Sequence, residues 1–326
     1  MSEKRYRLFS AELKRQFGTR VHKISIDAGF GCPNRGGGRQ GSGCLFCDPN
    51  GSGAVGLDGR LPVAAQLEAG KEVMRRKYKA GLFMAYFQPF SNTLAPVATL
   101  RRLYDEALAV ADVVGLAVGT RPDCLPDEVL DLLADYHRRT CFWLEIGLQS
   151  SHDATLRALN RGHDLACFLD AWRRAKQRGL RVCVHLILGL PGEDRAAMLA
   201  TVDLLAELAV DGVKLHLLHV LRGTPLGERY LRGEVGLLDL EEYVAVVADL
   251  LERLPASTLI HRLTGDGPRD LLLAPLWSLN KWQVLNAIDA ELERRGSRQG
   301  DACRVQRTTP PDGSGGVVSV AGHRQG

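Results

Sequence analysis

Long apolar runs, a large excess of one charge and a high aromatic content are all missing from this sequence of 326 residues. No stretch approaches the roughly 18 consecutive apolar residues that cross a bilayer, and the charged start of the chain contains no apolar signal core. We therefore expect a cytoplasmic protein that does not span a membrane. The net charge of only +4 excludes a strongly basic coat for nucleic acid, but not a local basic patch.

What is present is ordinary globular composition. Hydrophobic residues make up 45% and charged residues 25% of the chain, which excludes a wholly disordered, collagen-like or coiled-coil protein. The length suits one large domain of the size of an α/β barrel, about 250 residues, with extensions.

Short β-rich runs alternate along the chain with stretches that repeat apolar residues at helical spacing. The predicted strands are residues 24–28, 82–88, 113–119, 142–149, 182–189, 213–220 and, more weakly, 258–263, and the predicted helices are residues 61–79, 95–110, 126–138, 164–178, 195–209 and 280–295. Repeated alternation implies right-handed crossovers and a parallel sheet, either a closed barrel or an open one of about six units. We predict the open form: an α/β fold with a partial (β/α)6 barrel and a C-terminal helical extension.

Four segments follow from this pattern. They are an N-terminal helical segment at 1–20, the partial barrel at 21–265, the helical extension at 266–303 and a tail at 304–326, rich in glycine, proline, threonine and serine, that we expect to be disordered. In a barrel of this kind, functional side chains gather past the C-terminal ends of the strands. The polar segments 262–267 and 277–281, beyond the last strand, are therefore predicted to lie on the substrate side.

Three of the eight cysteines are grouped, with eleven residues between Cys32 and Cys44 and two between Cys44 and Cys47. In a reducing compartment this grouping favours metal ligation over a disulfide framework. A structural zinc ion needs a fourth ligand, and the nearby candidate, His22, precedes the first strand. A [4Fe–4S] cluster on three cysteines leaves one iron open to a small molecule. The spacing favours the cluster and leaves zinc as the alternative.

Several motifs, taken together, resemble the radical S-adenosylmethionine (SAM) enzymes and most closely the YhcC-type proteins, which are similar to the Elongator catalytic subunit. They are CPNR at 32–35, CLFC at 44–47, AYFQPFSNT at 85–93, GTRPDCL at 119–125, WLEIGLQS at 143–150, NRGH at 160–163 and HLILGLPGE at 185–193. The resemblance runs from about residue 6 to residue 303. The long spacer between the first two cysteines departs from the commonest spacing of the superfamily and fits this subgroup.

The resemblance implies one [4Fe–4S] cluster on Cys32, Cys44 and Cys47, with the amino and carboxylate groups of SAM on the fourth iron. One electron, from a donor such as flavodoxin or ferredoxin, would cleave SAM into methionine and a 5′-deoxyadenosyl radical that takes a hydrogen atom from the substrate. The residues that the resemblance assigns to SAM are Phe46, Gln88, Asn92, Thr93, Glu145, Gln149, Arg161, Ile187 and Gly189. Those after the second strand stand where the superfamily usually has a Gly-Gly-Glu segment.

The other five cysteines have no pair spacing, so we expect no second cluster and predict that most of them are buried. Cys124 is the exception, because it follows the third strand at the expected barrel mouth, where a thiol could quench a substrate radical. Packing is the preferred interpretation even there. His216 and His219, on the sixth strand, are predicted to line the barrel or its core.

The resemblance also implies a tRNA substrate, with the side chain at carbon 5 of a wobble uridine as the most natural target. Arg35, Arg39, Arg157 and Arg161 are the candidate RNA contacts near the mouth, and a small phosphorylated or carboxylated substrate would use the same residues. Two alternatives stay open. One is a radical SAM enzyme that acts on a small metabolite or a protein, and the other is a non-catalytic, zinc-stabilised RNA-binding protein.

Overall fold

A curled parallel sheet forms the centre of the molecule. The computed structural model describes residues 4–41, 43–48, 51, 57–265 and 267–305. In this part of the chain seven strands pair in the order β1-β2-β3-β4-β5-β6-β8, every neighbouring pair is parallel, and β7 and β9 form a small antiparallel ribbon. The strands are β1 (Val21–Ile26), β2 (Leu82–Phe87), β3 (Val113–Thr120), β4 (Cys141–Gln149), β5 (Val182–Leu188), β6 (Gly212–Leu217), β7 (Val220–Leu221), β8 (Leu259–Arg262) and β9 (Leu272–Ala274).

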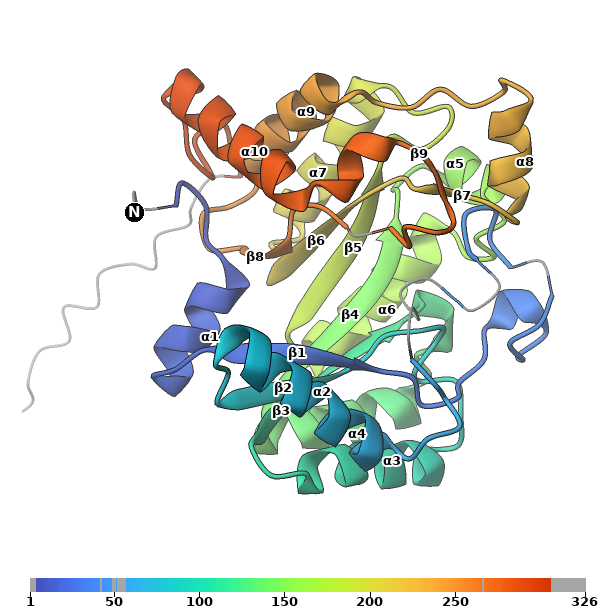
Figure 1. The fold of residues 1–326 in the computed structure, drawn as a ribbon, viewed down its shortest axis with the longest axis vertical. Coiled ribbons are helices and arrows are strands. Elements are labelled where there is room, and N and C mark those ends of the chain that lie inside the picture. Colours follow the sequence, from blue (N-terminus) through green and yellow to red (C-terminus); the bar gives the residue numbers. More distant parts are fainter. Residues whose placement is uncertain (1–3, 42, 49–50, 52–56, 266, 306–326) are drawn as a thin grey trace, which may run out of the picture.

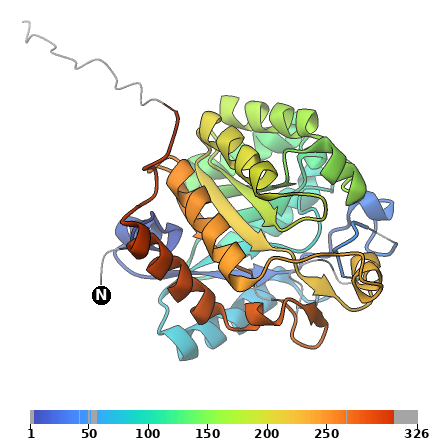
Figure 2. The same ribbon diagram turned by 90° about the horizontal axis from the view of Figure 1, so that it is seen from above.

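Helices connect successive strands and cover the outer face of the sheet (Figures 1 and 2). They are α1 (Phe9–Phe17), α2 (Val63–Tyr78), α3 (Val97–Ala109), α4 (Asp127–Arg139), α5 (Asp153–Ala158), α6 (Leu165–Gln177), α7 (Arg195–Glu207), α8 (Pro225–Leu231), α9 (Leu240–Arg253) and α10 (Lys281–Arg295), with short 3-10 turns η1 (Pro33–Arg35), η2 (Pro122–Cys124) and η3 (Leu276–Leu279). The aspartates that precede α6, α7 and α9 each accept a hydrogen bond from a backbone N–H of the first turn, which fixes where these helices begin.

Alternate residues of each strand point to opposite faces of the sheet, as the two-residue period of a strand requires. On β4, Phe142 and Leu144 belong to the large core beneath the helices, whereas Trp143 belongs to a second cluster inside the curl. The inner face also carries Glu145 and Gly147, which line a cavity. The sheet therefore has an apolar outer face and an inner face that becomes polar toward one end.

The N-terminal helix closes the other end of the curl. Helix α1 contacts both β1 and β8, the two edge strands, and Leu8 forms an isolated parallel bridge with Ile260 of β8 (Figure 1). The Phe9 ring stacks on His261 with 3.9 Å between centroids and meets the Trp143 ring edge to face at 5.2 Å. This apolar plug leaves the end at the C-termini of the strands as the way into the barrel.

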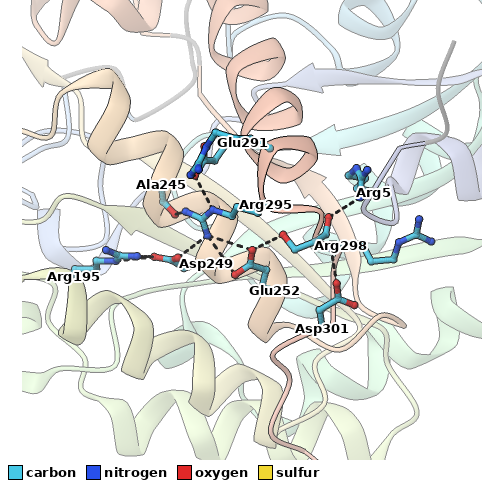
Figure 3. A network of polar contacts seen from close by, with 11 residues as sticks. Arg5, Arg195, Ala245, Asp249, Glu252, Glu291, Arg295, Arg298 and Asp301 are labelled. Carbon is cyan, nitrogen blue, oxygen red and sulfur yellow. Dashed lines mark hydrogen bonds and ion pairs between the residues drawn. The ribbon is translucent and has the colours of Figure 1, made fainter.

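A network of charged residues fixes the C-terminal helix to the barrel (Figure 3). Arg295 of α10 donates to Asp249 at 2.8 Å and to Glu252 at 3.3 Å, both on α9, and to Glu291 at 2.7 Å on its own helix. Asp249 also accepts a 2.7 Å hydrogen bond from Arg195 of α7. One carboxylate therefore joins three helices on the same side of the sheet.

The predicted fold class is confirmed. Every predicted strand and helix has a counterpart in the structure, although several boundaries differ by two or three residues. The sheet has one strand more than six, because the weak strand at 258–263 pairs in full with β6 as β8. Helices α5, α8 and α9 and the β7–β9 ribbon were not predicted. Most of the tail expected to be disordered, 306–326, lies outside the described residues.

Across the described chain, no helix combines the length and the apolar character needed to cross a membrane.

Candidate active site

A cavity opens at the C-terminal end of the barrel. It encloses about 1430 Å³ of space not filled by atoms, open solvent at its mouth included, and is lined by residues of β2, β3, β4, β5, β6 and β8. The grouped cysteines Cys32, Cys44 and Cys47 all line it. Among the residues predicted to bind SAM, those in its lining are Phe46, Gln88, Glu145, Gln149, Arg161 and Ile187.

The cysteine loop is held by its own backbone and by one arginine. The Cys32 N–H donates to the Gly38 carbonyl at 2.8 Å, and the Arg35 guanidinium donates to the carbonyls of Arg39 at 2.8 Å and Asp48 at 2.7 Å. A side chain at Gly31 would collide with the Gly37 backbone, so the close crossing of these two segments requires glycine there. The loop therefore brings its cysteines to the cavity in a fixed arrangement.

Cys44 lies in an environment that favours its thiolate. Its hydrogen bond with Cys47 lowers the pKa of Cys44 to about 5, and the Arg161 guanidinium adds to this against the opposing effect of burial. Arg161 Nη1 lies 3.6 Å from the sulfur and Asn34 Nδ2 lies 3.3 Å from it. The thiolate is the form that binds metal, so the site is prepared for ligation.

The donor set fits an iron–sulfur cluster better than a zinc ion. Among the described residues, no three His, Cys, Asp or Glu side chains converge on one point as a single metal ion requires. A cubane cluster instead takes each thiolate on a different iron, so its three cysteines need not converge. The described part of the lining contains three cysteines and no fourth, which matches a cluster with one iron free of protein ligands.

Two arginines direct donors toward the same space. Arg161 is buried and gives Nη2 to the Gly147 carbonyl at 2.9 Å, while its Nε has no hydrogen-bond partner among the described residues. Arg121 pairs with Asp123 at 2.7 Å and keeps Nη1 without a partner in the same described set. A buried guanidinium with an unused donor suits a carboxylate ligand. The predicted role of Arg161 therefore agrees with its geometry.

The end of β4 carries backbone strain beside the cavity. Gln149 has φ +76°, a left-handed conformation that costs a residue other than glycine about 1–3 kcal/mol, and it follows an irregularity in the pairing with β5. A Cβ at Gly147 would lie 2.7 Å from Arg161 Nη2 and Gln149 Nε2, so a side chain there would displace these two groups. Such strain is typical of ligand sites and turns this strand end toward the cavity.

Farther inside the barrel, Glu145 is the centre of a buried charged cluster. Its carboxylate pairs with Lys23, accepts from Lys214 at 3.0 Å and contacts His185 at 2.7 Å. Burial alone would raise the pKa of Glu145, but the two lysines hold that pKa well below its ordinary value. Burial also lowers the pKa of Lys214 to about 8, although Glu145 opposes the shift, and Lys214 donates to the Tyr86 hydroxyl at 2.7 Å. Strong pKa shifts inside a cleft are typical of functional sites.

Three residues predicted to contact SAM make other contacts in the structure. Asn92 and Thr93 are absent from the described lining of the cavity, and both side chains are used within the fold. Asn92 donates to the Gly119 carbonyl at 2.8 Å, and the Thr93 hydroxyl donates to the Cys124 carbonyl at 2.6 Å. Gly189 is also absent from that lining, and its left-handed backbone packs against a leucine. These residues stabilise the strand-end loops instead of facing the cavity.

Cys124 and the loop arginines also lie differently from the predictions. Cys124 is buried outside the described cavity lining, which favours the packing interpretation over radical quenching, and burial raises its pKa to about 12. Arg35 is buried with its loop, whereas Arg39 pairs with Asp27 and stacks over Phe90 with 4.4 Å to the ring centroid. A glycine-rich loop has few other side chains to hold it, so it uses these two arginines internally.

The sequence did not point to four polar residues inside the barrel as part of the site. They are Lys23, Tyr86, His185 and Lys214. The usable signal was present in residues 213–217, where Lys214 and His216 alternate with apolar residues inside a predicted parallel strand. Because a parallel sheet is covered by helices on its outer face, such alternation places the polar side chains inside the barrel.

Comparison with known proteins agrees with this arrangement. Residues 28–205 match the profile of the Radical SAM superfamily, and residues 210–294 match that of the Radical_SAM C-terminal domain. The solved structure of an archaeal Elp3 from Methanocaldococcus infernus shares the fold with a TM-score of 0.66 at 17% identity, over 86% of this chain and 64% of that one.

Full-length relatives are more similar in sequence. YtqA of Bacillus subtilis is 46% identical over 299 residues, which cover 92% of this chain and 93% of the relative. YhcC of Escherichia coli is 41% identical over 295 residues, covering 90% and 94%. Elongator complex protein 3 of Schizosaccharomyces pombe is 32% identical over 162 residues, but these cover only 49% of this chain and 29% of that protein. The chain is therefore an enzyme of the radical SAM superfamily and belongs to the family of YhcC and YtqA.

Proposed function

We propose that this enzyme binds a [4Fe–4S] cluster and SAM in the barrel cavity and modifies the side chain at carbon 5 of a wobble uridine in tRNA. The observation that carries the first part is the shared cavity: three cysteines, Arg161 and the strained end of β4 all line one space. The tRNA substrate is the finer part of the proposal and needs its own support.

The chain's own residues have distinct tasks in this proposal. Cys32, Cys44 and Cys47 hold the cluster, and when bound it supplies the electron and the open iron at which SAM is cleaved. Arg161, beside Cys44, orients the methionine carboxylate through its unused Nε, because a guanidinium matches a carboxylate in shape and charge. Phe46 provides an apolar wall for the rest of SAM. The closed lower end of the barrel keeps water from the reacting centre.

Two observations support an RNA substrate. The similarity to Elongator complex protein 3 spans half of this chain, and an exposed arginine lies near the cysteine loop at the mouth. A base in a folded RNA must leave its stack to reach a cavity that is entered only from one end. The exposed Arg157 on α5 lies near the cysteine loop, because the following residues Leu159 and Asn160 bond to that loop at 3.1 and 2.7 Å. Arg157 is therefore suited to contact a backbone phosphate at the mouth.

The proposal also needs an electron donor of low potential, and a flavodoxin or ferredoxin is the class we infer. The test combines this donor, or dithionite, with anaerobically reconstituted enzyme, SAM and bulk tRNA, followed by digestion and mass analysis of the nucleosides. We expect one wobble uridine derivative to change mass and 5′-deoxyadenosine or methionine to accumulate. The control variant carries alanine at all three cluster cysteines.

Formation of 5′-deoxyadenosine without any change in tRNA nucleosides would contradict the tRNA substrate. It would instead favour a small metabolite or a protein. A wild-type protein that neither binds iron nor cleaves SAM would contradict the whole proposal.

A further inference from the structure

Three neighbouring strands carry charged or ionisable residues in one row of the sheet. The strand register aligns His185 of β5 with Lys214 of β6 and Lys214 with Arg262 of β8. All three line the cavity, together with His216, two residues beyond Lys214. The row lies next to β4, because His185 is also the register partner of Gly147.

Among the described residues, positive charge exceeds negative charge in this part of the barrel. Lys23 and Lys214 both donate to the single carboxylate of Glu145, and Arg262 adds a third positive charge nearby. Among the described residues, Arg262 makes no hydrogen bond and no ion pair, although its charge lowers the pKa values of Lys214 and His216. Partly buried cations without a partner are costly, so they usually have a ligand to meet.

His216 adds an unused polar atom. Its Nε2 is buried and has no hydrogen-bond partner in the described structure. Burial, and then the nearby Lys214, lowers the pKa of His216 well below its ordinary value, so the ring is neutral at pH 7 and can donate from Nε2. A neutral donor next to two cations is an arrangement that recognises the oxygens of an anion.

We propose that this wall of the cavity binds an anionic group of the substrate, a carboxylate or a phosphate, through Lys214, His216 and Arg262. The inference rests on the proposed function only where it takes tRNA as the molecule that carries the anion. The anion would neutralise the surplus charge beside β5, β6 and β8. It would thereby orient the substrate within the cavity.

The first test measures anion binding directly and needs no reaction. Thermal unfolding of the anaerobically reconstituted enzyme is followed in sodium acetate or inorganic phosphate against sodium chloride at equal ionic strength. The variants are Arg262→Gln, the charge-preserving Arg262→Lys and, as a matched control, Arg222→Gln, which replaces an exposed arginine outside the described cavity lining. General salt effects act on all variants alike and cancel in the comparison.

We expect Arg262→Gln to unfold at the same or a higher temperature than the wild type in chloride, because it removes an unpaired cation from a positive region. It should lose the extra stabilisation by acetate or phosphate, while Arg262→Lys and Arg222→Gln keep it. A purely structural role for Arg262 would instead lower the unfolding temperature in every salt. Equal responses to acetate and phosphate in wild type and Arg262→Gln would overturn the proposal.

The second test decides whether the anion belongs to the substrate or to SAM. With tRNA as substrate, Arg262→Gln should weaken productive substrate binding about 10- to 100-fold, the loss expected for one charge-assisted hydrogen bond, and leave SAM affinity unchanged. A fall in SAM affinity would assign the wall to the methionine carboxylate and refute the substrate reading. If wild-type enzyme modifies no tRNA, the proposed function fails, and the acetate and phosphate comparison still decides this inference.

Discussion

Glu145→Gln offers a direct measure of the charged cluster inside the barrel. The Glu145 side chain is fully buried, and the substitution removes its charge while keeping its size. It leaves Lys23 and Lys214 without a counter-charge. Breaking one side of a buried ion pair costs about 3–5 kcal/mol. The Lys23 side chain is 22% exposed and partly solvated, whereas that of Lys214 is 5% exposed. We therefore expect a loss near the lower limit, about 3 kcal/mol of unfolding free energy at pH 7.

The loss should depend on pH in a defined direction. The pKa of Lys214 is about 8 in the folded protein, below the 10.5 of a free lysine, so its charge opposes folding below pH 8 and ceases to do so between pH 8 and 10.5. The unfolded lysine is the same in both proteins, so their difference depends on the folded states alone. Loss of Glu145 lowers the pKa of Lys214 further, so the difference should shrink as pH rises toward about 8 and stay level above it. The pKa of Glu145 is depressed, so its stabilising effect is present above its ordinary pKa of 4.5 and is lost as pH falls below it.

Urea unfolding of the apoprotein, followed by tryptophan fluorescence, measures both effects. Trp143 is buried two residues before Glu145 and reports on this region. Glu207→Gln, at the exposed end of α7, is the matched control and should change stability by less than about 0.5 kcal/mol. Combining Glu145→Gln with Lys214→Met should recover part of the loss, because the unpaired charge is then gone. A loss below about 1 kcal/mol at pH 7, or a difference that does not shrink as pH rises toward about 8, would refute the reasoning.

Three further outcomes follow from the structure. The triple alanine variant of the cluster cysteines should bind no cluster, measured as iron content and visible absorption after reconstitution, and full iron content would contradict the assignment. Arg161→Ala should weaken SAM binding by about 1.5–3 kcal/mol, measured by equilibrium dialysis. It should also slow alkylation of Cys44 at pH 6, because the pKa of that thiol then rises. Unchanged SAM affinity and an unchanged alkylation rate would remove Arg161 from the site. Asp249→Asn should lower the unfolding free energy by about 1 kcal/mol, since it weakens the partly exposed pairs with Arg195 and Arg295, and an unchanged urea midpoint would show that this network adds no stability.

The order of strands and helices could be predicted because a parallel sheet covered by helices has a strong pattern. Strands such as 142–149 are apolar on the outer face, and the helices between them have one apolar side. Helix α9 was missed although its sequence has a polar side. It packs against both α7 and α10, and eight of its fourteen residues are buried.

Residues at the rim of the site could be predicted from the sequence, whereas several residues inside the barrel could not. Motif residues such as Cys32, Cys44 and Arg161 are recognisable because their spacing and order are unusual. Lys214 looks like part of the solvent-facing half of an ordinary strand, and only the curl of the sheet turns that half inward, whereas His216 was predicted to line the barrel or its core and does line the cavity. Side-chain pairing across strands far apart in the sequence, such as that of Lys23 with Glu145, cannot be read from one strand at a time.

Arg35 and Arg39 show that an arginine can look available for a ligand in the sequence and still be used inside a folded loop. Arg35 and Arg39 look available for RNA in the sequence, yet one binds carbonyls of its own loop and the other pairs with Asp27. Removing either would disturb the cysteine loop itself, so a loss of RNA binding in such variants would not identify a phosphate contact. Arg157 is exposed and sits on a helix docked beside that loop. The search for RNA contacts at the mouth therefore has to start from Arg157, where charge can be removed without removing the support of the cluster ligands.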